Sequence, residues 1–170
     1  MTAEQERIER KERVERYHSL RYGDEKIKTW LGGGTDGEVW KSSQETAIKV
    51  FQRLAGYANE RDTYLRLAEY GVVRKLAGFW IPIILDYDDE LMIVEMSLMN
   101  KPPYVIDFAK VRIDRPPDFD EETLQEAERQ GRERFEHNWP KVKGLLGALE
   151  SFNIFYLDPN RGNITFPDMP

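Results

Sequence analysis

The amino-acid sequence predicts an α+β protein, in which a β-rich N-terminal part with one helix precedes a smaller helical part. Two β-type runs flank a glycine-rich loop in WLGGGTDGEVWKSSQETAIKVF, residues 30–51. A segment with helical spacing, YANERDTYLRLAEYG, follows, and two apolar strands lie within GFWIPIILDYDDELMIVEM. Helical patterns then dominate the segment between residues 118 and 152.

Length and composition limit the classes of function. The chain has 170 residues, of which 40% are hydrophobic, so it can bury one core, divided at most between two small lobes. Its 25 basic and 31 acidic residues give a net charge of −6, which argues against nucleic-acid binding. Cysteine is absent, and His18 and His137 are too few for a histidine cluster. We therefore expect neither zinc nor redox chemistry.

The first 24 residues are densely charged, and opposite charges recur three or four positions apart, which predicts a helix over residues 1–24. Ile8 and Val14 give it only a thin apolar stripe, so it is either a solvated surface helix or a docking element for a partner. This segment lacks the apolar core of a signal peptide, and no later apolar run approaches the ~18 residues of a membrane span. We expect a cytoplasmic protein without a membrane partner.

The glycine loop contains the spacing Gly32-x-Gly34-x-x-Gly37. This spacing alone is weak, because it occurs in ordinary turns and also opens dinucleotide-binding Rossmann units. A Rossmann glycine loop leads into a helix, whereas here EVWKS and TAIKVF are two β-type runs joined by a turn. The context therefore favours a glycine loop between antiparallel strands.

This arrangement resembles the protein kinases, with Val39 two residues after the last glycine and Ala47-Ile48-Lys49 on the next strand. The resemblance implies a five-stranded antiparallel N-lobe with one C-helix and a nucleotide site for ATP. In that site the glycine backbone approaches the phosphates, Val39 and Ala47 lie against the adenine, and Lys49 contacts the α- and β-phosphates. The alternative is that Lys49 is a solvent-facing strand lysine, but its apolar neighbours indicate a buried strand, in which a lysine needs a partner.

Glu60 is the partner that the resemblance implies for Lys49. It lies early in the helical pattern that includes Tyr64 and Leu67 and that can end at Gly71. This is the position of the C-helix glutamate in kinases. The alternative is a solvated glutamate in a charged run. The short interval between the lysine and the glutamate predicts a helix clipped at its front.

The hinge of the kinase-like site is expected at Glu95–Leu98, after the second apolar strand. By resemblance, backbone groups of this segment, including Glu95 and Met96, pair with the edge of the adenine. Val94 or Ile93 would then lie near the gatekeeper position. Because the contacts come from the backbone, the side chains here carry little information.

Asp107 lies in YVIDFAKV, which resembles the Asp-Phe-Gly metal-binding segment of kinases. Its order is different, since in kinases this segment follows the catalytic loop, whereas here it precedes it. Two interpretations stay open. Either the segment is an unrelated strand after the hinge, or this chain brings an aspartate to the nucleotide from another place in the sequence.

The segment YLDPNRGN, residues 156–163, resembles the kinase catalytic loop. It follows two predicted helices, one capped by Asp118 or Asp120 and one beginning near Trp139-Pro140. By resemblance, Asp158 accepts or orients the proton of the substrate hydroxyl, and Asn163 holds Mg²⁺. The loop departs from the family at three positions: Leu157 replaces an arginine, Asn160 replaces a lysine, and Arg161 is only an approximate substitute for that lysine.

The sequence ends soon after Asn163, so we expect a truncated C-lobe without an activation loop, as in short bacterial kinase-like proteins. The expected regions are the charged helix at 1–24, the N-lobe at 25–98, and the hinge extension with the helical remnant at 99–170. The second ligand of Mg²⁺ would be Asp168, Asp107 or neither. With it, the protein would transfer the γ-phosphate of ATP to a Ser/Thr-type hydroxyl of an unidentified protein; without it, the protein would be a nucleotide-binding pseudokinase or an interaction module.

Overall fold

A five-stranded antiparallel sheet forms the N-terminal half of the molecule, in a computed structural model that describes residues 2–168. The strands follow the order β1-β2-β3-β7-β6. Their bounds are Thr29–Gly33, Gly37–Lys41, Thr46–Phe51, Ile93–Ser97 and Ile84–Asp88, respectively. The predicted α+β class and five-stranded sheet are confirmed. Within the described residues, no helix combines the length and the apolar character that crossing a membrane requires.

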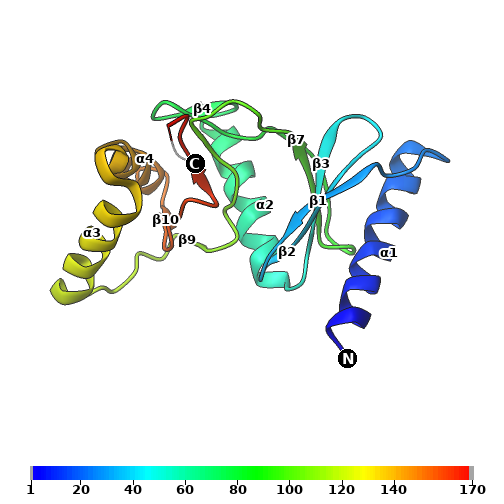
Figure 1. Cartoon of the computed structure of the whole chain (residues 1–170), viewed down its shortest axis with the longest axis horizontal. Coiled ribbons are helices and arrows are strands. Elements are labelled where there is room, and N and C mark those ends of the chain that lie inside the picture. Colours follow the sequence, from blue (N-terminus) through cyan, green and yellow to red (C-terminus); the bar gives the residue numbers. More distant parts are fainter. Residues whose placement is uncertain (1, 169–170) are drawn as a thin grey trace.

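Two helices cover opposite faces of this sheet (Figure 1). Helix α1, Ala3–Tyr22, begins at Thr2, whose hydroxyl accepts a hydrogen bond from the Gln5 amide. Helix α2, Leu54–Glu69, lies on the other face. Side chains of β3 alternate between them, since Ile48 and Val50 pack toward α1 while Ala47 and Phe51 join the cluster on the α2 side.

The thin apolar stripe of Ile8 and Val14 was compatible with a solvated surface helix, but one side of α1 is buried. Val14, Tyr17 and His18 are buried, while Ile8 is half exposed. The burial of Tyr17 was missed because its hydroxyl reaches acidic groups on the sheet, and a hydrophobicity pattern does not register such polar contacts.

The second half of the chain contains two strand–loop–strand units that pair with one another. In the first, β8, Tyr104–Val105, and β9, Val111–Ile113, flank the segment 106–110, which we term the Asp107 loop. In the second, β10, Ile154–Tyr156, and β11, Ile164–Thr165, flank the segment 157–163, which we term the Asp158 loop. Strand β8 pairs with β11 and β9 pairs with β10, both antiparallel, so the two loops are held beside each other.

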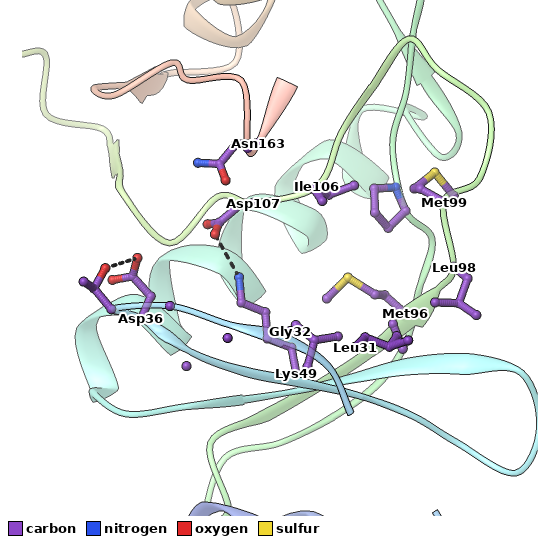
Figure 2. A pocket seen from close by; sticks show the side chains of 18 of the residues that line it. Leu31, Gly32, Asp36, Lys49, Met96, Leu98, Met99, Ile106, Asp107 and Asn163 are labelled. Atoms are coloured by element: carbon purple, nitrogen blue, oxygen red, sulfur yellow. Dashed lines mark hydrogen bonds and ion pairs between the residues drawn. The ribbon is translucent and has the colours of Figure 1, made fainter. Parts of the chain in front are cut away.

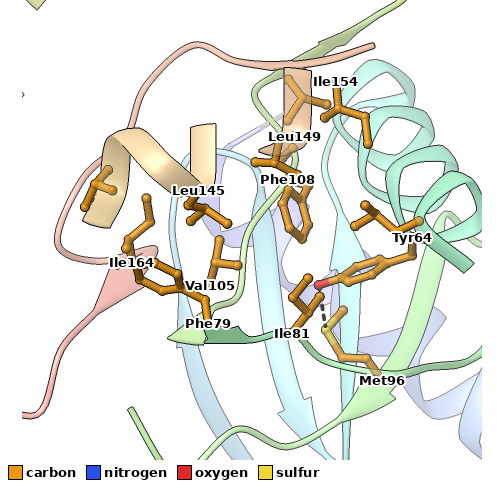
Figure 3. Packing of buried hydrophobic residues seen from close by; sticks show 14 of the residues in the cluster. Tyr64, Phe79, Ile81, Met96, Val105, Phe108, Leu145, Leu149, Ile154 and Ile164 are labelled. Carbon is orange, nitrogen blue, oxygen red and sulfur yellow. Dashed lines mark hydrogen bonds between the residues drawn. The ribbon is translucent and has the colours of Figure 1, made fainter. Parts of the chain in front are cut away.

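The short hairpin of β4, Lys75–Leu76, and β5, Phe79–Trp80, extends the β8–β11 pair to four strands. Helix α3, Glu121–Phe135, begins at Asp120, whose carboxylate accepts a hydrogen bond from the Thr123 amide. A 3₁₀ turn, η1, Glu136–Asn138, connects it to α4, Trp139–Glu150. Leu145 and Leu149 of α4 join Phe108 and Tyr64 in one cluster, which ties the helical part to the sheet (Figure 3).

Candidate active site

A cleft of about 510 Å³ lies between the glycine loop and the two loops of the second half (Figure 2). Strand β3 and the end of β7 form its floor and inner end. Nine of the residues singled out in the sequence line it: Gly32, Gly34, Gly37, Val39, Ala47, Lys49, Met96, Asp107 and Asn163. Four other predicted site residues do not, namely Glu60, Glu95, Asp158 and Asp168.

The three predicted glycines serve two different purposes. A Cβ atom added at Gly32 or Gly34 would meet nothing within 4 Å, so the loop leaves open space at these positions. At Gly37 an added Cβ would lie 2.1 Å from the Val50 carbonyl oxygen, so this glycine is required by the close approach of β2 and β3. The Gly34 amide donates to the Gly37 carbonyl at 2.9 Å, which closes the turn.

Lys49, Glu60 and Asp107 form a connected charge cluster at the floor of the cleft. The Lys49 ammonium group donates to Glu60 Oε2 at 2.7 Å and lies 3.3 Å from Asp107 Oδ2. Glu60 is completely buried on α2, and its Oε2 also accepts a hydrogen bond from the Phe108 amide at 3.2 Å. The lysine is therefore neither solvent-facing nor unpartnered, and Figure 2 shows it pointing toward Asp107.

The cluster perturbs both members of the Lys49–Glu60 pair. Burial raises the pKa of Glu60 to about 7, against the opposing effect of Lys49 and with a further increase from the negative charge of Asp107. Burial alone would lower the pKa of Lys49, but the carboxylates of Glu60 and Asp107 outweigh it and raise that pKa. The pKa values of Glu60 and Lys49 are both raised because the charge of one lysine is shared by two carboxylates.

Asp107 is fixed from several directions. Its Oδ1 accepts a hydrogen bond from the Ala109 amide at 2.8 Å, and its backbone carbonyl accepts one from the Tyr156 hydroxyl at 2.6 Å. Tyr156 is the last residue of β10, immediately before the Asp158 loop, so this bond ties the start of that loop to the Asp107 loop. The pairing of β8 with β11 and of β9 with β10 explains how an aspartate that precedes the catalytic-loop motif reaches the same cleft. The interpretation as an unrelated strand is thus corrected.

In the Asp158 loop, Asn163 faces the cleft while Asp158 lies outside its lining. The Asp158 carboxylate is about half exposed and accepts a hydrogen bond from Arg134 Nη1 at 3.3 Å. The same nitrogen donates to the Pro159 carbonyl at 3.0 Å. Arg161 points elsewhere, with its Nε donating to the Arg134 carbonyl at 2.6 Å. The cation beside Asp158 therefore comes from α3, and sequence reasoning missed it because nothing distinguishes Arg134 from the other charged residues of that helix.

Asp168 is placed away from the cleft, which corrects its prediction as a metal ligand. Its carboxylate accepts a hydrogen bond from Asn138 Nδ2 at 3.1 Å and contacts His137 Nε2 at 2.6 Å. The contact with Asn138 is the main cause that lowers the pKa of Asp168, followed in the same direction by His137. The buried side chain of Phe166, packed against Phe79 and Phe135, turns this end of the chain toward η1.

The segment expected to form the hinge lies at one end of the cleft. Glu95 pairs with Ile48 across the sheet and faces α1, where its buried carboxylate accepts a hydrogen bond from the Tyr17 hydroxyl at 2.8 Å. Met96 faces the cleft together with Ala47, its partner on β3. Its sulfur accepts a hydrogen bond from the Tyr64 hydroxyl at 3.7 Å. Because strand side chains alternate, the side chain of Met96 faces the cleft and that of Glu95 does not. The lining continues through residues 97–99, and it does not include Val94 or Ile93, which were expected near the gatekeeper position.

The oxygen-bearing side chains at the cleft suit magnesium. Asp107 and Asn163 lie on the side of the cleft opposite Gly32 (Figure 2). Between residues 2 and 168 no group of three His, Cys, Asp or Glu side chains is arranged to hold a metal ion. Mg²⁺ commonly takes one or two protein oxygens and completes its octahedron with water and substrate phosphates. One carboxylate and one amide therefore fit an ion that arrives with a nucleotide.

Comparison with known proteins finds similarity among solved structures but not among sequences. No protein-family model and no curated protein sequence matches the chain. Among solved structures, the ternary complex of APH(2″)-IIa with streptomycin and ATP is similar, at 12% sequence identity and a TM-score of 0.42. The match covers 88% of this chain and 41% of that one, so the chain spans less than half the length of this structural neighbour.

Proposed function

We propose that the protein binds ATP with Mg²⁺ in this cleft and transfers the γ-phosphate to a hydroxyl group, as kinase-like phosphotransferases do. The observation that carries the proposal is the buried Lys49–Glu60 pair with the partly exposed Asp107 beside it, under an open glycine loop and at the same cleft as Asn163. Burying a paired lysine costs desolvation free energy, so its place beside the open space of the glycine loop favours a role in binding an anionic group.

Binding of the nucleotide is divided between the two ends of the cleft. At the inner end, backbone groups of residues 96–99 pair with the adenine, and the apolar side chains of Val39 and Ala47 lie against its faces. At the outer end, Lys49 contacts the phosphates, held in place by Glu60. The volume of the cleft lies within the range typical of small-molecule sites, roughly 300–1,000 Å³.

Asp107 and Asn163 would hold the magnesium ion, which would supply positive charge against the negative charge of the transferred phosphoryl group. Asp107 is suited to this task because its other contacts, with the Ala109 amide and with Lys49, fix its orientation.

Asp158 orients the acceptor hydroxyl and receives its proton. It lies beside the cleft and is about half exposed, so an acceptor that approaches from solvent can reach it. Arg134 holds the carboxylate by contacts with its Oδ1 atom and with the next carbonyl. We expect the acceptor to be a Ser/Thr-type hydroxyl of a protein.

The first test is ATP binding, measured as a shift of the melting temperature with Mg²⁺. A ligand that binds only the folded state raises this temperature, and Lys49→Ala and Asp107→Asn should abolish most of the shift. Asp168→Asn is the matched control, because it changes an aspartate that lies away from the cleft and should keep the full shift. Absence of any shift in the wild-type protein at millimolar ATP would contradict the proposal.

A second candidate is a nucleotide-binding module that transfers no phosphate. It is favoured by one observation, namely that the Asp158 carboxylate is paired with Arg134 and lies outside the cleft lining. Transfer from radiolabelled ATP to the protein itself or to a generic protein acceptor separates the two candidates. The phosphotransferase should lose transfer by a factor of about 10²–10⁴ in Asp158→Ala while still binding ATP. Binding without transfer to any acceptor would favour the module.

A further inference from the structure

Two carboxylates are buried on the face of the sheet away from the cleft, and the proposed reaction uses neither. Glu38 follows Gly37 on β2, and Glu95 precedes Met96 on β7. They are respectively 6% and 0% exposed. Each therefore stands next to a cleft-lining residue, one on the strand that leaves the glycine loop and one on the strand that leads to the residues expected to bind adenine.

Helix α1 supplies the partners of both carboxylates. Arg10 donates to Glu38 Oε1 from Nε at 3.1 Å and from Nη2 at 2.9 Å. At the other end of the helix, Arg21 Nε lies 2.9 Å from Glu95 Oε2. The hydroxyls of Tyr17 and Tyr22 also donate to Glu95, and that of Thr46 on β3 completes its set of contacts.

These contacts hold α1 across the face of the sheet that lies away from the cleft. Arg10 and Arg21 are about three helical turns apart, roughly 16 Å along the helix axis. Between them, Arg13 donates to the carbonyl of Phe51, the last residue of β3, at 2.8 Å and to that of Leu91, just before β7, at 3.0 Å. Apolar packing of Val14 and Tyr17 on the sheet would hold the helix without these charges.

The contact at Glu38 reaches the glycine loop directly. Glu38 pairs with Gly33 across the β1–β2 hairpin, and a Cβ atom at Gly33 would lie 3.1 Å from Glu38 Cγ. The glutamate side chain thus covers the base of the loop from behind, and Arg10 holds that side chain against it. Movement of the loop relative to β3 requires this contact to change.

We propose that α1 is a positioning element for the nucleotide, which sets the glycine loop through Arg10 and Glu38 and sets the hinge strand through the contacts at Glu95. The role of the helix as a nucleotide-positioning element rests on the proposed function, while its hold on the glycine loop does not. Loss of the Arg10–Glu38 contact leaves the loop in its binding-competent arrangement for a smaller fraction of the time, and the affinity for ATP falls by that fraction.

The test compares Arg10→Gln with Arg16→Gln on the same helix. Arg16 is a matched control because its pair with Glu90 is 3.5 Å long and both side chains are mostly exposed. Arg10→Gln should weaken ATP binding about five- to tenfold by calorimetry, and Arg16→Gln should leave it unchanged. The double variant Arg10→Gln/Glu38→Gln leaves no unpaired carboxylate buried, and it should weaken binding as much as the single variant does.

Amide hydrogen exchange of the protein without ligand provides the independent measurement. Arg10→Gln should accelerate exchange in residues 31–37 and leave α2 and α4 unchanged, because the contact acts on the loop and not on the core. Acceleration throughout the chain, or an unchanged ATP affinity in both the single and the double variant, would overturn the proposal. If the wild-type protein binds no ATP, the proposed function fails, and selective exchange in the loop alone then decides whether α1 holds it.

Discussion

At the scale of single residues, the ionised form of Glu60 beneath the cleft opposes the stability of the folded chain. Glu60 is completely buried, and its Oε1 atom has no hydrogen-bond partner within the described chain. Only Oε2 is engaged, by Lys49 and by the Phe108 amide. The raised pKa of Glu60 means that the folded protein holds the proton on this residue more tightly than the unfolded chain does.

This pKa shift predicts a pH dependence. Because the folded-state pKa of Glu60, about 7, lies above the ordinary value of 4.5, its contribution to stability is fully present below pH 4.5 and is lost as the pH rises through 7. Glu60→Gln cannot titrate. From pH 5 to pH 8 the free energy of unfolding of the wild-type protein should therefore fall by up to about 3 kcal/mol relative to this variant.

Urea unfolding at the two pH values measures the difference, and Glu69→Gln, which changes an exposed glutamate on the same helix, is the control. Wild-type and Glu60→Gln curves that move in parallel with pH would show that Glu60 is ionised throughout, and would contradict its raised pKa.

Residue types and order identified some members of this cluster and could not identify others. Lys49 and Glu60 could be paired from the sequence because a strand lysine and an early helix glutamate stand in a fixed order. Asp107 stood in an order that left two interpretations open, and only the pairing of β8 and β9 with β11 and β10 places it at the cleft. The position of Arg134 beside Asp158 depends on how α3 packs, which no local pattern encodes.

At the scale of elements, the length of a strand decided whether it could be predicted. Strands β2, β3, β6 and β7 have five or six residues, enough for an apolar pattern to be read. Strands β4, β5, β8 and β11 have two residues each, so they carry no periodicity and exist because their partners lie nearby. Which side chains of β7 face the cleft could not be predicted for a related reason, since both faces of β7 are buried and alternation in hydrophobicity is absent.

The glycine loop gives a prediction at this scale. Gly37→Ala should destabilise the protein by about 1–3 kcal/mol, because the added carbon would overlap the Val50 carbonyl oxygen on the neighbouring strand. Gly34→Ala should leave stability almost unchanged, since its Cβ enters open space, but should weaken ATP binding by filling space that the phosphates need. Thermal unfolding with and without Mg²⁺ and ATP measures both effects. Equal destabilisation by the two substitutions would contradict the division of roles between these glycines.

At the scale of the whole molecule, one buried cluster joins the sheet, α2, the Asp107 loop and the helices of the second half. Within it, the ring of Phe108 lies edge-on to that of Tyr64 of α2, with 5.3 Å between ring centroids (Figure 3). The same ring lies edge-on to Tyr156 of β10 at 5.9 Å. A smaller cluster under α1 shares the same sheet from its other face. Strand β3 thus contributes side chains to both clusters, Ala47 and Phe51 to the main one and Ile48 and Val50 to the one under α1.

This connectivity predicts a single cooperative unfolding transition. The indole resonances of Trp40, which packs against the cluster under α1, and of Trp139, in the main cluster, should disappear at the same urea concentration. Phe108→Ala should lower the free energy of unfolding by about 3–5 kcal/mol and shift both resonances by the same amount of urea. Leu124→Ala, at an exposed position on α3, should shift neither. If Trp139 were lost before Trp40, the helical half would unfold independently of the sheet, and the cleft between them would form only when both halves are folded.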